Sequence, residues 1–494
     1  MNIMFCHLGR EHLGIEYLSA VLKQNGFKVG LAYDPGYFSK QDNTIHSPFM
    51  ERIFKREKEM LNKIYREKPD IVAFSVYTAT YKWATRIAKL IKENIETKIV
   101  FGGTHPTLIP NAVINNKYVD FVVIGEGEER FLELVRSLEK GNTNCEVDNV
   151  YFRKGNRIIK NKVSATLANL DLLPYPDKEL FENYIYYKDS YLALASRGCP
   201  NSCSYCCESF LNNKYNHRYF RQRSVKSIIG ELEYMKDRYD FKEIVFFDNI
   251  FHIDKRWLRS FLKEYKSNIN VLFKCMAHVS LFDKETAILL KGNCCYAVNF
   301  GIQSMDENVR ERVLMRHTTN NQIENALRIC DEVNLQFDID LIFDLPGEKE
   351  ENIIKKAGFF KQFRSLNRVK CFNLSYFPKL DIVNIARNEN LISDSDIKAI
   401  ENGEAGDPFH VSTSKDRHAA KVNRALKIFY KILPALPLNL VKYFSLKKRY
   451  YKLYYIPEFL VILLQVFIGL RNRDPRFQIY LKDYLRRFKY PFQI

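Results

Sequence analysis

The sequence lacks a long apolar run. A membrane-spanning helix needs roughly 20 consecutive apolar residues, and the nearest candidate, Phe459–Leu470, is shorter and contains Gln465. The chain also does not open on a basic stretch followed by an apolar one, which is the pattern of a secretory signal. We therefore expect a cytoplasmic protein whose 11 cysteines are reduced. In that compartment a tight cysteine cluster more readily binds metal than forms disulfides.

Acidic residues are scarce in one part of the chain. The 494 residues carry a formal charge of +18. Residues 415–494 hold 18 Lys and Arg against 4 Asp and Glu, so +14 of the excess lies there and the preceding part is nearly balanced. The length predicts two or three domains.

The first 140 residues alternate β-rich runs with helical patterns, which predicts a Rossmann-like parallel sheet with helices on both faces. Such sheets bind ligands beyond the carboxyl ends of their strands. Here that edge comprises the loops at 7–14, 75–80, 102–110 and 125–128. The expected strands are 2–6, 28–32, 70–75, 97–101 and 119–124, and the expected helices are Gly14–Asn25, Thr80–Glu96 and Gly127–Glu139.

Residues 141–190 are interpreted as a connector with an exposed hairpin around Gly155-Asn156. A second alternating series, over 191–380, predicts a partial (β/α)6 barrel, and residues 381–494 a helical C-terminal region. Chemistry on such a barrel belongs at the carboxyl ends of its strands. The expected strands are 192–196, 243–247, 271–277, 296–302, 335–343 and 370–376, with helices at Ser224–Tyr239, Lys255–Asn268, Asn320–Val333 and Glu350–Phe363.

Three cysteines follow the first strand of this barrel: Cys199, Cys203 and Cys206, spaced C-x3-C-x2-C. Three thiolates can hold three irons of a cubane cluster and leave the fourth open, as a catalytic site requires. The alternative is a zinc knuckle with Cys207 or His217 as fourth ligand. Zinc sites usually show paired elements, which this loop lacks.

With Tyr205 at the aromatic position of the motif, this loop resembles that of the radical S-adenosylmethionine (SAM) superfamily. The resemblance implies a [4Fe–4S] cluster on Cys199, Cys203 and Cys206. It also implies SAM bound at the open iron and cleaved to a radical that abstracts hydrogen from an unactivated carbon. The cofactors carry that chemistry, and the protein orients them.

Further SAM contacts implied by the resemblance follow later strands. We expect Asp248 to face the SAM amino group, with a buried salt-bridged carboxylate as the alternative. Gln303 and Ser304 end the fourth strand, and Arg316 is our choice for the SAM carboxylate, with a solvated helix face as the alternative. Relatives usually carry glycine where Asp344 stands, which puts the close backbone approach to adenine in doubt. The expected SAM set is Tyr205, Asp248, Gln303, Ser304 and Arg316.

The N-terminal domain resembles the cobalamin-binding domain of class B radical SAM methyltransferases, which are related to the bacteriochlorophyll cyclase and hopanoid methylases. The resemblance rests on the glycine-rich turns after the fourth and fifth strands. Ordinary turn chemistry in a doubly wound domain is the alternative. The residues expected to contact cobalamin are Ser75, Thr78, Gly102, Gly103, Thr104, His105, Gly125, Glu126 and Gly127.

The chain lacks the Asp-x-His-x-x-Gly motif of proteins that bind cobalt through histidine. Its first loop contains His7 and His12, and neither has Asp two residues before it and Gly three after it. We therefore expect cobalamin without a protein histidine below the cobalt, and we interpret His12 as a loop residue.

In the C-terminal region, Lys447-Lys448-Arg449 and several tyrosines precede the apolar stretch Phe459–Leu470, and Arg471, Arg473 and Arg476 follow it. This pattern is typical of a segment lying on an anionic membrane face, here the inner face. Nucleic-acid binding is the rival interpretation, which we do not favour. A helix that covers the barrel while its bases are solvated is an equal alternative.

These features predict a C-methyltransferase that uses both cofactors on a small or lipid-like substrate, with a one-electron donor such as flavodoxin or ferredoxin. The alternative keeps both cofactors but performs a rearrangement or cyclisation. Transfer-RNA methylthiolation needs three N-terminal cysteines for a second cluster, and only Cys6 and Cys145 precede Cys199. A zinc-bound scaffold is the non-enzyme alternative.

Overall fold

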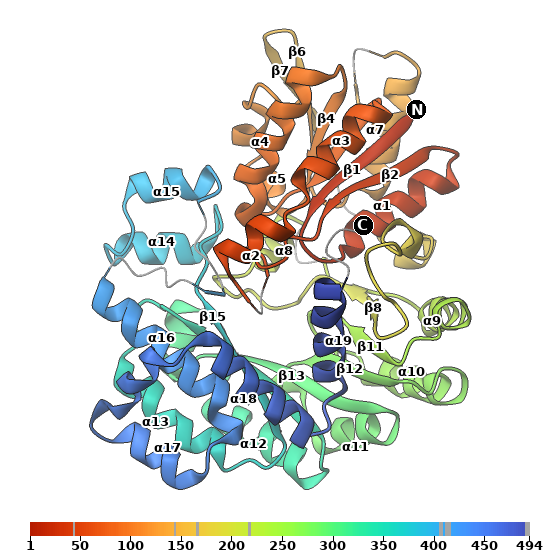
Figure 1. Ribbon diagram of the computed structural model, residues 1–494. Coiled ribbons are helices and arrows are strands. Elements are labelled where there is room, and N and C mark those ends of the chain that lie inside the picture. Colours follow the sequence, from red (N-terminus) through yellow and green to blue (C-terminus); the bar gives the residue numbers. More distant parts are fainter. Residues whose placement is uncertain are drawn as a thin grey trace. The chain divides into compact units, whose positions relative to one another are not determined.

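The computed structural model describes residues 1–42, 45–142, 145–164, 167–215, 219–404, 409–410 and 416–489. The packing of the chain divides it into two compact units. The first consists of residues 1–185, 205–221 and 376–405, and the second of residues 186–204, 222–375 and 406–494. Helices and strands are labelled in Figure 1.

The first unit is built on a seven-stranded sheet in the order β2-β1-β3-β4-β5-β6-β7. Strands β1 to β5 are parallel, as the sequence predicts. The predicted hairpin around Gly155-Asn156 is confirmed and pairs antiparallel with β5, so it extends the sheet. The strands are β1 (Asn2–Leu8), β2 (Lys28–Asp34), β3 (Ile71–Ser75), β4 (Lys98–Gly102), β5 (Phe121–Val123), β6 (Val150–Lys154) and β7 (Arg157–Lys160).

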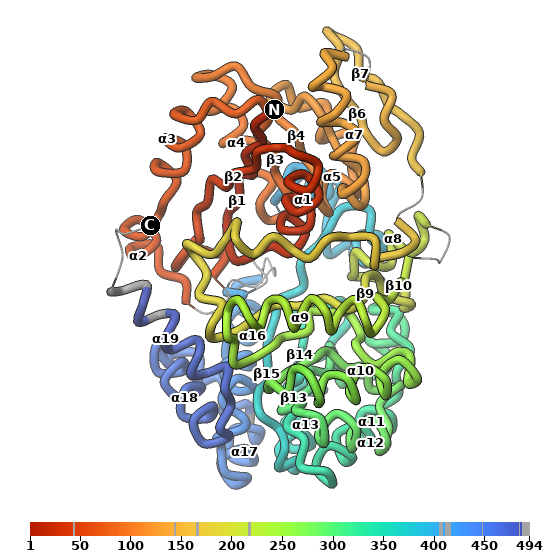
Figure 2. Tube along the Cα trace, turned by 90° about the vertical axis from the view of Figure 1, so that its right-hand side faces the viewer, coloured from red at the N-terminus to blue at the C-terminus, as the bar shows by residue number. Residues whose placement is uncertain are grey.

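Helices cover both faces of this sheet because its central strands are apolar throughout. Helix α1 packs beside α7 and α3 beside α4, with α1 and α3 on opposite sides of β1 and β2 (Figure 2). The helices are α1 (Leu13–Gln24), α2 (Pro48–Phe54), α3 (Glu57–Glu67), α4 (Thr78–Asn94), α5 (Thr104–Leu108), α6 (Pro110–Ile114), α7 (Glu128–Glu139), α8 (Cys207–Lys214), α14 (Asp381–Asn388) and α15 (Asp394–Glu401), with 3-10 turns η1 (Leu170–Leu172) and η2 (Lys178–Leu180).

The second unit contains the predicted six-stranded parallel sheet, in the order β15-β14-β13-β12-β11-β8. Its strands are β8 (Tyr191–Ala193), β11 (Glu243–Phe246), β12 (Leu272–Ala277), β13 (Cys295–Gln303), β14 (Gln336–Phe343) and β15 (Leu366–Asn373). Two short strands, β9 (Ser196–Arg197) and β10 (Arg221–Gln222), form a separate ribbon.

Helices alternate with these strands and continue after β15. They are α9 (Val225–Tyr239), α10 (Lys255–Asn268), α11 (Lys284–Gly292), α12 (Asn320–Glu332), α13 (Glu350–Lys361), α16 (Arg417–Ile432), α17 (Leu438–Ser445), α18 (Glu458–Arg471) and α19 (Pro475–Lys489), with 3-10 segments η3 (Val279–Leu281), η5 (Leu433–Ala435) and η6 (Leu446–Tyr455) and the π-helix η4 (Val309–Val313).

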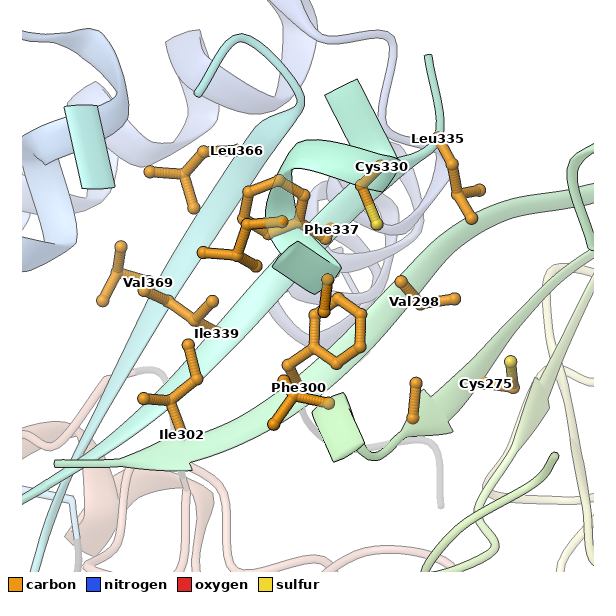
Figure 3. Close-up of a cluster of buried hydrophobic side chains, with 14 of the residues drawn as sticks. Cys275, Val298, Phe300, Ile302, Cys330, Leu335, Phe337, Ile339, Leu366 and Val369 are labelled. Carbon is orange, nitrogen blue, oxygen red and sulfur yellow. The ribbon is translucent and has the colours of Figure 1, made fainter. Parts of the chain in front are cut away.

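The barrel sheet has an apolar face and a polar face. Val298, Phe300 and Ile302 alternate along β13 and belong to the same buried core as Cys330 of α12 (Figure 3). Asn299, on the opposite face, accepts a hydrogen bond from Lys370 Nζ at 2.6 Å. The apolar residues therefore fill the space between sheet and helices, and charged residues line the inner face.

Strand β15 begins at residue 366, four residues before the predicted start. Its first part contains Asn367, Arg368 and Lys370, which are polar because they lie in a buried charge cluster. Apolar periodicity does not reveal such a strand.

We call this group the ionic layer: Lys274, Asp338, Arg368, Lys370 and Asp474. Asp338 is fully buried and pairs with Lys274, with Arg368 at 3.1 Å and with Lys370 at 3.6 Å. Asp474, from the turn between α18 and α19, lies 3.3 Å from Arg368 Nε. The C-terminal region is thereby tied to the amino ends of the barrel strands.

Among the residues the structure describes, no single helix is long and apolar enough to span a membrane. One pair, Lys448–Tyr455 and Glu458–Arg471, bent by 107°, meets the length and composition together.

We predict that Asp338→Asn lowers the free energy of unfolding by about 3–5 kcal/mol, because it leaves buried cations without their counter-ion. Burial alone would raise the pKa of Asp338, but Arg368, Lys274 and Lys370 hold it well below its ordinary value. This stabilisation is therefore complete above the unfolded carboxyl pKa of about 3.9 and is lost as the pH falls through the lower, folded value. Urea unfolding at pH 7 and at pH 3 measures both effects.

Asp394→Asn is the matched control, because its side chain is 70% exposed and pairs only at the surface with Arg387. We expect that change to cost less than about 1 kcal/mol. Equal losses for the two variants would contradict a stabilising ionic layer.

Candidate functional site

The carboxyl ends of the parallel strands of the first sheet bring four predicted loops to one edge. The backbone N–H of Val76 donates to the carbonyl of Gly102 at 2.8 Å, and the N–H of His105 donates to the carbonyl of Val76 at 3.0 Å. Ser75, Gly102 and Thr104 are half-buried at this edge. The loops after β3 and β4 therefore form one continuous surface.

His12 caps the amino end of α1. Its Nδ1 accepts from the Ile15 N–H at 3.3 Å, and its Nε2 lies 3.1 Å from Ser75 Oγ. Burial lowers the pKa of His12 to about 4, so the ring is neutral and Nε2 carries the proton. Both nitrogens are engaged within the protein, in keeping with the interpretation of His12 as a loop residue.

Two of the expected cobalamin contacts lie beneath the surface of this edge. His105 and Thr78 are fully buried, and His105 Nδ1 lies 3.1 Å from Thr78 Oγ1. The His105 ring packs on Tyr81 with centroids 4.3 Å apart, and burial lowers its pKa to about 4. These side chains support the loops from below.

Gly103 is required by the protein's own backbone. Its φ is +95°, and a Cβ there would lie 2.8 Å from both N and O of Val76. Only glycine lets the loop after β4 pass so close to the loop after β3.

A segment distant in sequence, residues 215 and 219–221, packs on the loop after β5. Arg221 forms a two-pronged ion pair with Glu126, with N–O distances of 2.6 and 2.8 Å. The Tyr215 hydroxyl occupies the space that a Cβ on Gly125 would need, and the Tyr215 ring stacks on Tyr219 at 5.5 Å. Residues 205–221 therefore belong to the first unit, although this segment begins inside the cysteine loop with Tyr205 and Cys206.

Gly125→Ala should destabilise the first unit more than Gly141→Ala does. Both glycines have positive φ, +79° and +72°, so both changes add backbone strain of about 1–2 kcal/mol. Gly141 has no atom within 4 Å of its added Cβ, whereas Gly125 meets Tyr215, which adds roughly 1–3 kcal/mol of overpacking. Thermal unfolding measures the difference.

Tyr215→Phe in the Gly125→Ala background removes the overlapping hydroxyl. The double variant should therefore unfold near the temperature of Gly141→Ala. If the double variant unfolds at a temperature no higher than that of Gly125→Ala alone, Tyr215 does not occupy that space.

In the second unit, the residues after β11 fasten the start of the cysteine loop. Asp248 is buried and accepts hydrogen bonds from the Ala195 N–H at 3.1 Å and from Ser196 Oγ. Burial raises its pKa to about 6, although these bonds oppose the shift. Asn249 Nδ2 donates to the Gly198 carbonyl at 3.2 Å. Among the residues that the structure describes, hydrogen bonds rather than an ion pair thus hold Asp248, and Asn249 is a contact that the sequence did not reveal.

Ser304, at the end of β13, belongs to a buried network. Its hydroxyl donates to Glu348, whose pKa is raised to about 8 by burial. Its carbonyl accepts from Arg310 at 2.6 Å. Gln303, next to it, has φ +69° and is half-buried.

Asp344 adopts the backbone conformation that glycine favours. Its φ is +63°, and its carboxylate accepts a hydrogen bond from Asn423 of α16. Asp tolerates this region better than most residues do, so the chain adopts a glycine-like backbone conformation here without glycine.

The cysteines occupy the turn after β8 and β9. Cys203 is buried, and Cys199, Cys206 and Tyr205 are half-buried. Arg316 NH1 lies 3.7 Å from Cys203 Sγ. Cys207 begins α8, and His217 lies outside the described residues.

Within the described part of the chain, no group of three His, Cys, Asp or Glu side chains could hold a single metal ion. In a cubane cluster each thiolate binds a different iron, so the three sulfurs need not converge on one point. Three thiols from one loop, with Arg316 beside one of them, fit such a cluster.

Comparison with known proteins matches two parts of this chain to family models. Residues 10–135 match the B12 binding domain and residues 194–359 the radical SAM superfamily. An uncharacterised methyltransferase of Pyrococcus horikoshii is 28% identical over 60% of this chain and 64% of its own. The anaerobic magnesium-protoporphyrin IX monomethyl ester cyclase of Rubrivivax gelatinosus is 25% identical over 72% of this chain and 64% of its own. The chain thus spans just under two thirds of these relatives' lengths.

Among solved structures, the cobalamin-dependent S-adenosylmethionine radical enzyme OxsB, with aqua-cobalamin and S-adenosylmethionine bound, has a similar fold. The TM-score is 0.66 at 16% identity, over 99% of this chain and 75% of that one. The predicted order of domains, α/β sheet, partial barrel and helical C-terminal region, is confirmed.

Proposed function

The chain joins a B12-binding domain to a radical SAM domain, and from this premise we propose that it is a cobalamin-dependent radical SAM C-methyltransferase. The observation that carries the proposal is the C-x3-C-x2-C loop at the carboxyl end of the first strand of a six-stranded parallel barrel. The edge of the first sheet supplies the second site. A small or lipid-like substrate is proposed, with electrons from a donor such as flavodoxin or ferredoxin.

Cys199, Cys203 and Cys206 would hold a [4Fe–4S] cluster, with SAM at the open iron beside Tyr205, Asp248, Gln303 and Ser304. When bound, the cluster and SAM supply a carbon-centred radical, and cobalamin supplies a methyl group. Asp248 and Asn249 orient the turn that carries the cysteines, because they bind its backbone and Ser196.

Cobalamin would lie on the edge formed by the loops after β1, β3, β4 and β5. Ser75, Gly102, Thr104 and Gly127 are half-buried there. His105 and Thr78 hold the loops from below, and Glu126 anchors them through Arg221. With both nitrogens of His12 engaged, we propose that no protein histidine ligates the cobalt.

The second candidate is a rearrangement or ring closure that uses both cofactors without methyl transfer. The similarity to a cyclase is the observation behind this alternative, and the similarity to methyltransferases supports the first function more strongly. The two functions differ in their products. Methyl transfer consumes a second SAM and yields S-adenosylhomocysteine, whereas a rearrangement does not.

Replacing Cys199, Cys203 or Cys206 by Ala should abolish the visible absorbance of the cluster and the formation of 5′-deoxyadenosine, because each thiolate binds one iron. Cys207→Ala should leave both unchanged. Iron and sulfide analysis of anaerobically purified protein and chromatography of the SAM products measure these effects.

If cluster formation required Cys207 as much as the other three cysteines, the three-ligand proposal would be contradicted. Zinc in place of iron in the purified protein would support a zinc-bound scaffold without enzymatic activity. S-Adenosylhomocysteine at a level matching 5′-deoxyadenosine supports methyl transfer. Its absence in cobalamin-loaded protein favours the rearrangement.

We also propose that α18 binds an anionic membrane surface. Phe459, Leu463 and Phe467 are about 60% exposed and recur at spacings of four residues, so they share one face of the helix. Lys452, in η6 before the helix, and Arg473, in the turn after it, are exposed. An apolar helix face flanked by bases can lie in the headgroup region of anionic lipids.

The purified chain should co-sediment with vesicles of anionic phospholipid and less with neutral ones. Changing Lys447, Lys448 and Arg449 to Ser should weaken binding by ~1 kcal/mol per base, and rising salt should weaken it further. Changing Phe459, Leu463 and Phe467 to Ser removes the apolar contact with the lipids and should abolish vesicle binding.

Leu172→Ser is the matched control, because Leu172 is exposed in the first unit. No binding to either kind of vesicle would mean that α18 only covers the barrel, and equal binding to neutral and anionic vesicles would contradict a preference for an anionic surface. Binding to nucleic acid instead of anionic vesicles would support the rival partner.

A further inference from the structure

We propose that Arg316 is a positioning residue that raises the reduction potential of the cluster by donating a hydrogen bond to Cys203 Sγ. The proposal rests on the proposed function, because it assumes that Cys203 ligates iron. It assigns to Arg316 a role different from the SAM-carboxylate contact that the sequence suggested.

The guanidinium of Arg316 is held against the thiol. Its NH1 lies 3.7 Å from Cys203 Sγ, within the range of an N–H···S hydrogen bond, and the residue is 9% exposed. Solvent therefore screens this charge little. His278 lies in its field. Burial and Arg316 together lower the pKa of His278 to about 3, so His278 is neutral and adds no second positive charge.

The backbone around Arg316 is fastened to the cysteine loop. The N–H of Ser204 donates to the Leu314 carbonyl at 2.9 Å, and the Ser204 hydroxyl donates to the Val313 carbonyl at 2.5 Å. Both bonds join the residue after Cys203 to the turn that precedes Arg316. The backbone segments that carry Arg316 and Cys203 are therefore held next to each other.

A second arginine makes this turn rigid. Arg310 is fully buried and donates to the carbonyls of Ser304 at 2.6 Å and Thr318 at 3.0 Å. Its own carbonyl accepts from the Arg316 N–H at 2.8 Å. The turn also contains the π-helix η4, an irregularity that is frequent at functional sites. Arg310 thus holds in place the turn that carries Arg316.

The positive charge of Arg316 determines the direction in which the reduction potential shifts. Reduction adds one negative charge to a cluster and its thiolates. A buried cation that donates to a ligating sulfur stabilises the reduced form more than the oxidised form. Arg316 should therefore make the cluster easier to reduce by its electron donor.

The test uses the full-length chain with reconstituted cluster. The variant Arg316→Gln removes the charge, and Arg316→Lys keeps it. Arg312→Gln is the matched control, because Arg312 lies on the same turn and is exposed. Iron and sulfide content, the midpoint potential from a redox titration followed by electron paramagnetic resonance, and the dissociation constant of SAM are measured for each.

We expect Arg316→Gln to keep its cluster and to shift the midpoint to more negative values by about a tenfold change in the reduction equilibrium, ~59 mV for one electron. Arg316→Lys should restore part of the shift, and Arg312→Gln should show none. SAM affinity should change less than threefold.

An unchanged midpoint with a tenfold weaker SAM affinity would overturn the proposal and restore the carboxylate role. Loss of the cluster from a folded Arg316→Gln variant would overturn it too, since a tuning residue is not needed to hold iron. If Arg316→Gln does not fold, a midpoint of Arg316→Lys less negative than a tenfold shift supports the charge effect, and a midpoint at least as negative as a tenfold shift contradicts it. Failure of the native chain to bind any cluster would instead refute the proposed function.

Discussion

The ionic layer around Asp338 is the interaction on which the second unit depends. A carboxylate buried as deeply as Asp338 depends on its cations, because it has lost its water and an unpaired buried charge is costly. Lys274, Arg368 and Lys370 come from two barrel strands, and Asp474 brings the end of the chain to Arg368. Ion pairs therefore link the strands across the inner face of the barrel at their amino ends.

This arrangement separates stability from chemistry. The amino ends of the strands carry the charges that hold the unit together, and the carboxyl ends carry the cysteine loop, Asp248 and Ser304. In parallel sheets the loops at the carboxyl ends can vary without disturbing the packing below them. The first unit differs, since Gly103 and His105 support the carboxyl edge of its sheet from within.

The two arginines of the turn after β13 show how buried polar groups position a site. Arg310 contributes no exposed atom, yet it satisfies the carbonyls that shape the turn. Arg316 uses that turn to reach Cys203. The sequence places both among several basic residues on one short segment and does not distinguish them, because burial depends on what packs against the segment.

The sequence by itself determined the order of the two sheets, the parallel strands and the cysteine loop, because alternating apolar patterns and the C-x3-C-x2-C spacing are local. It placed the start of β15 too late, since charged strand residues are recognisable only beside their counter-ions. The contacts of Tyr215 and Arg221 with the loop after β5, and the conformation of Asp344 beside Asn423, were decided by tertiary structure alone. These contacts join residues far apart in the chain, and no local pattern encodes the space that a distant side chain will fill.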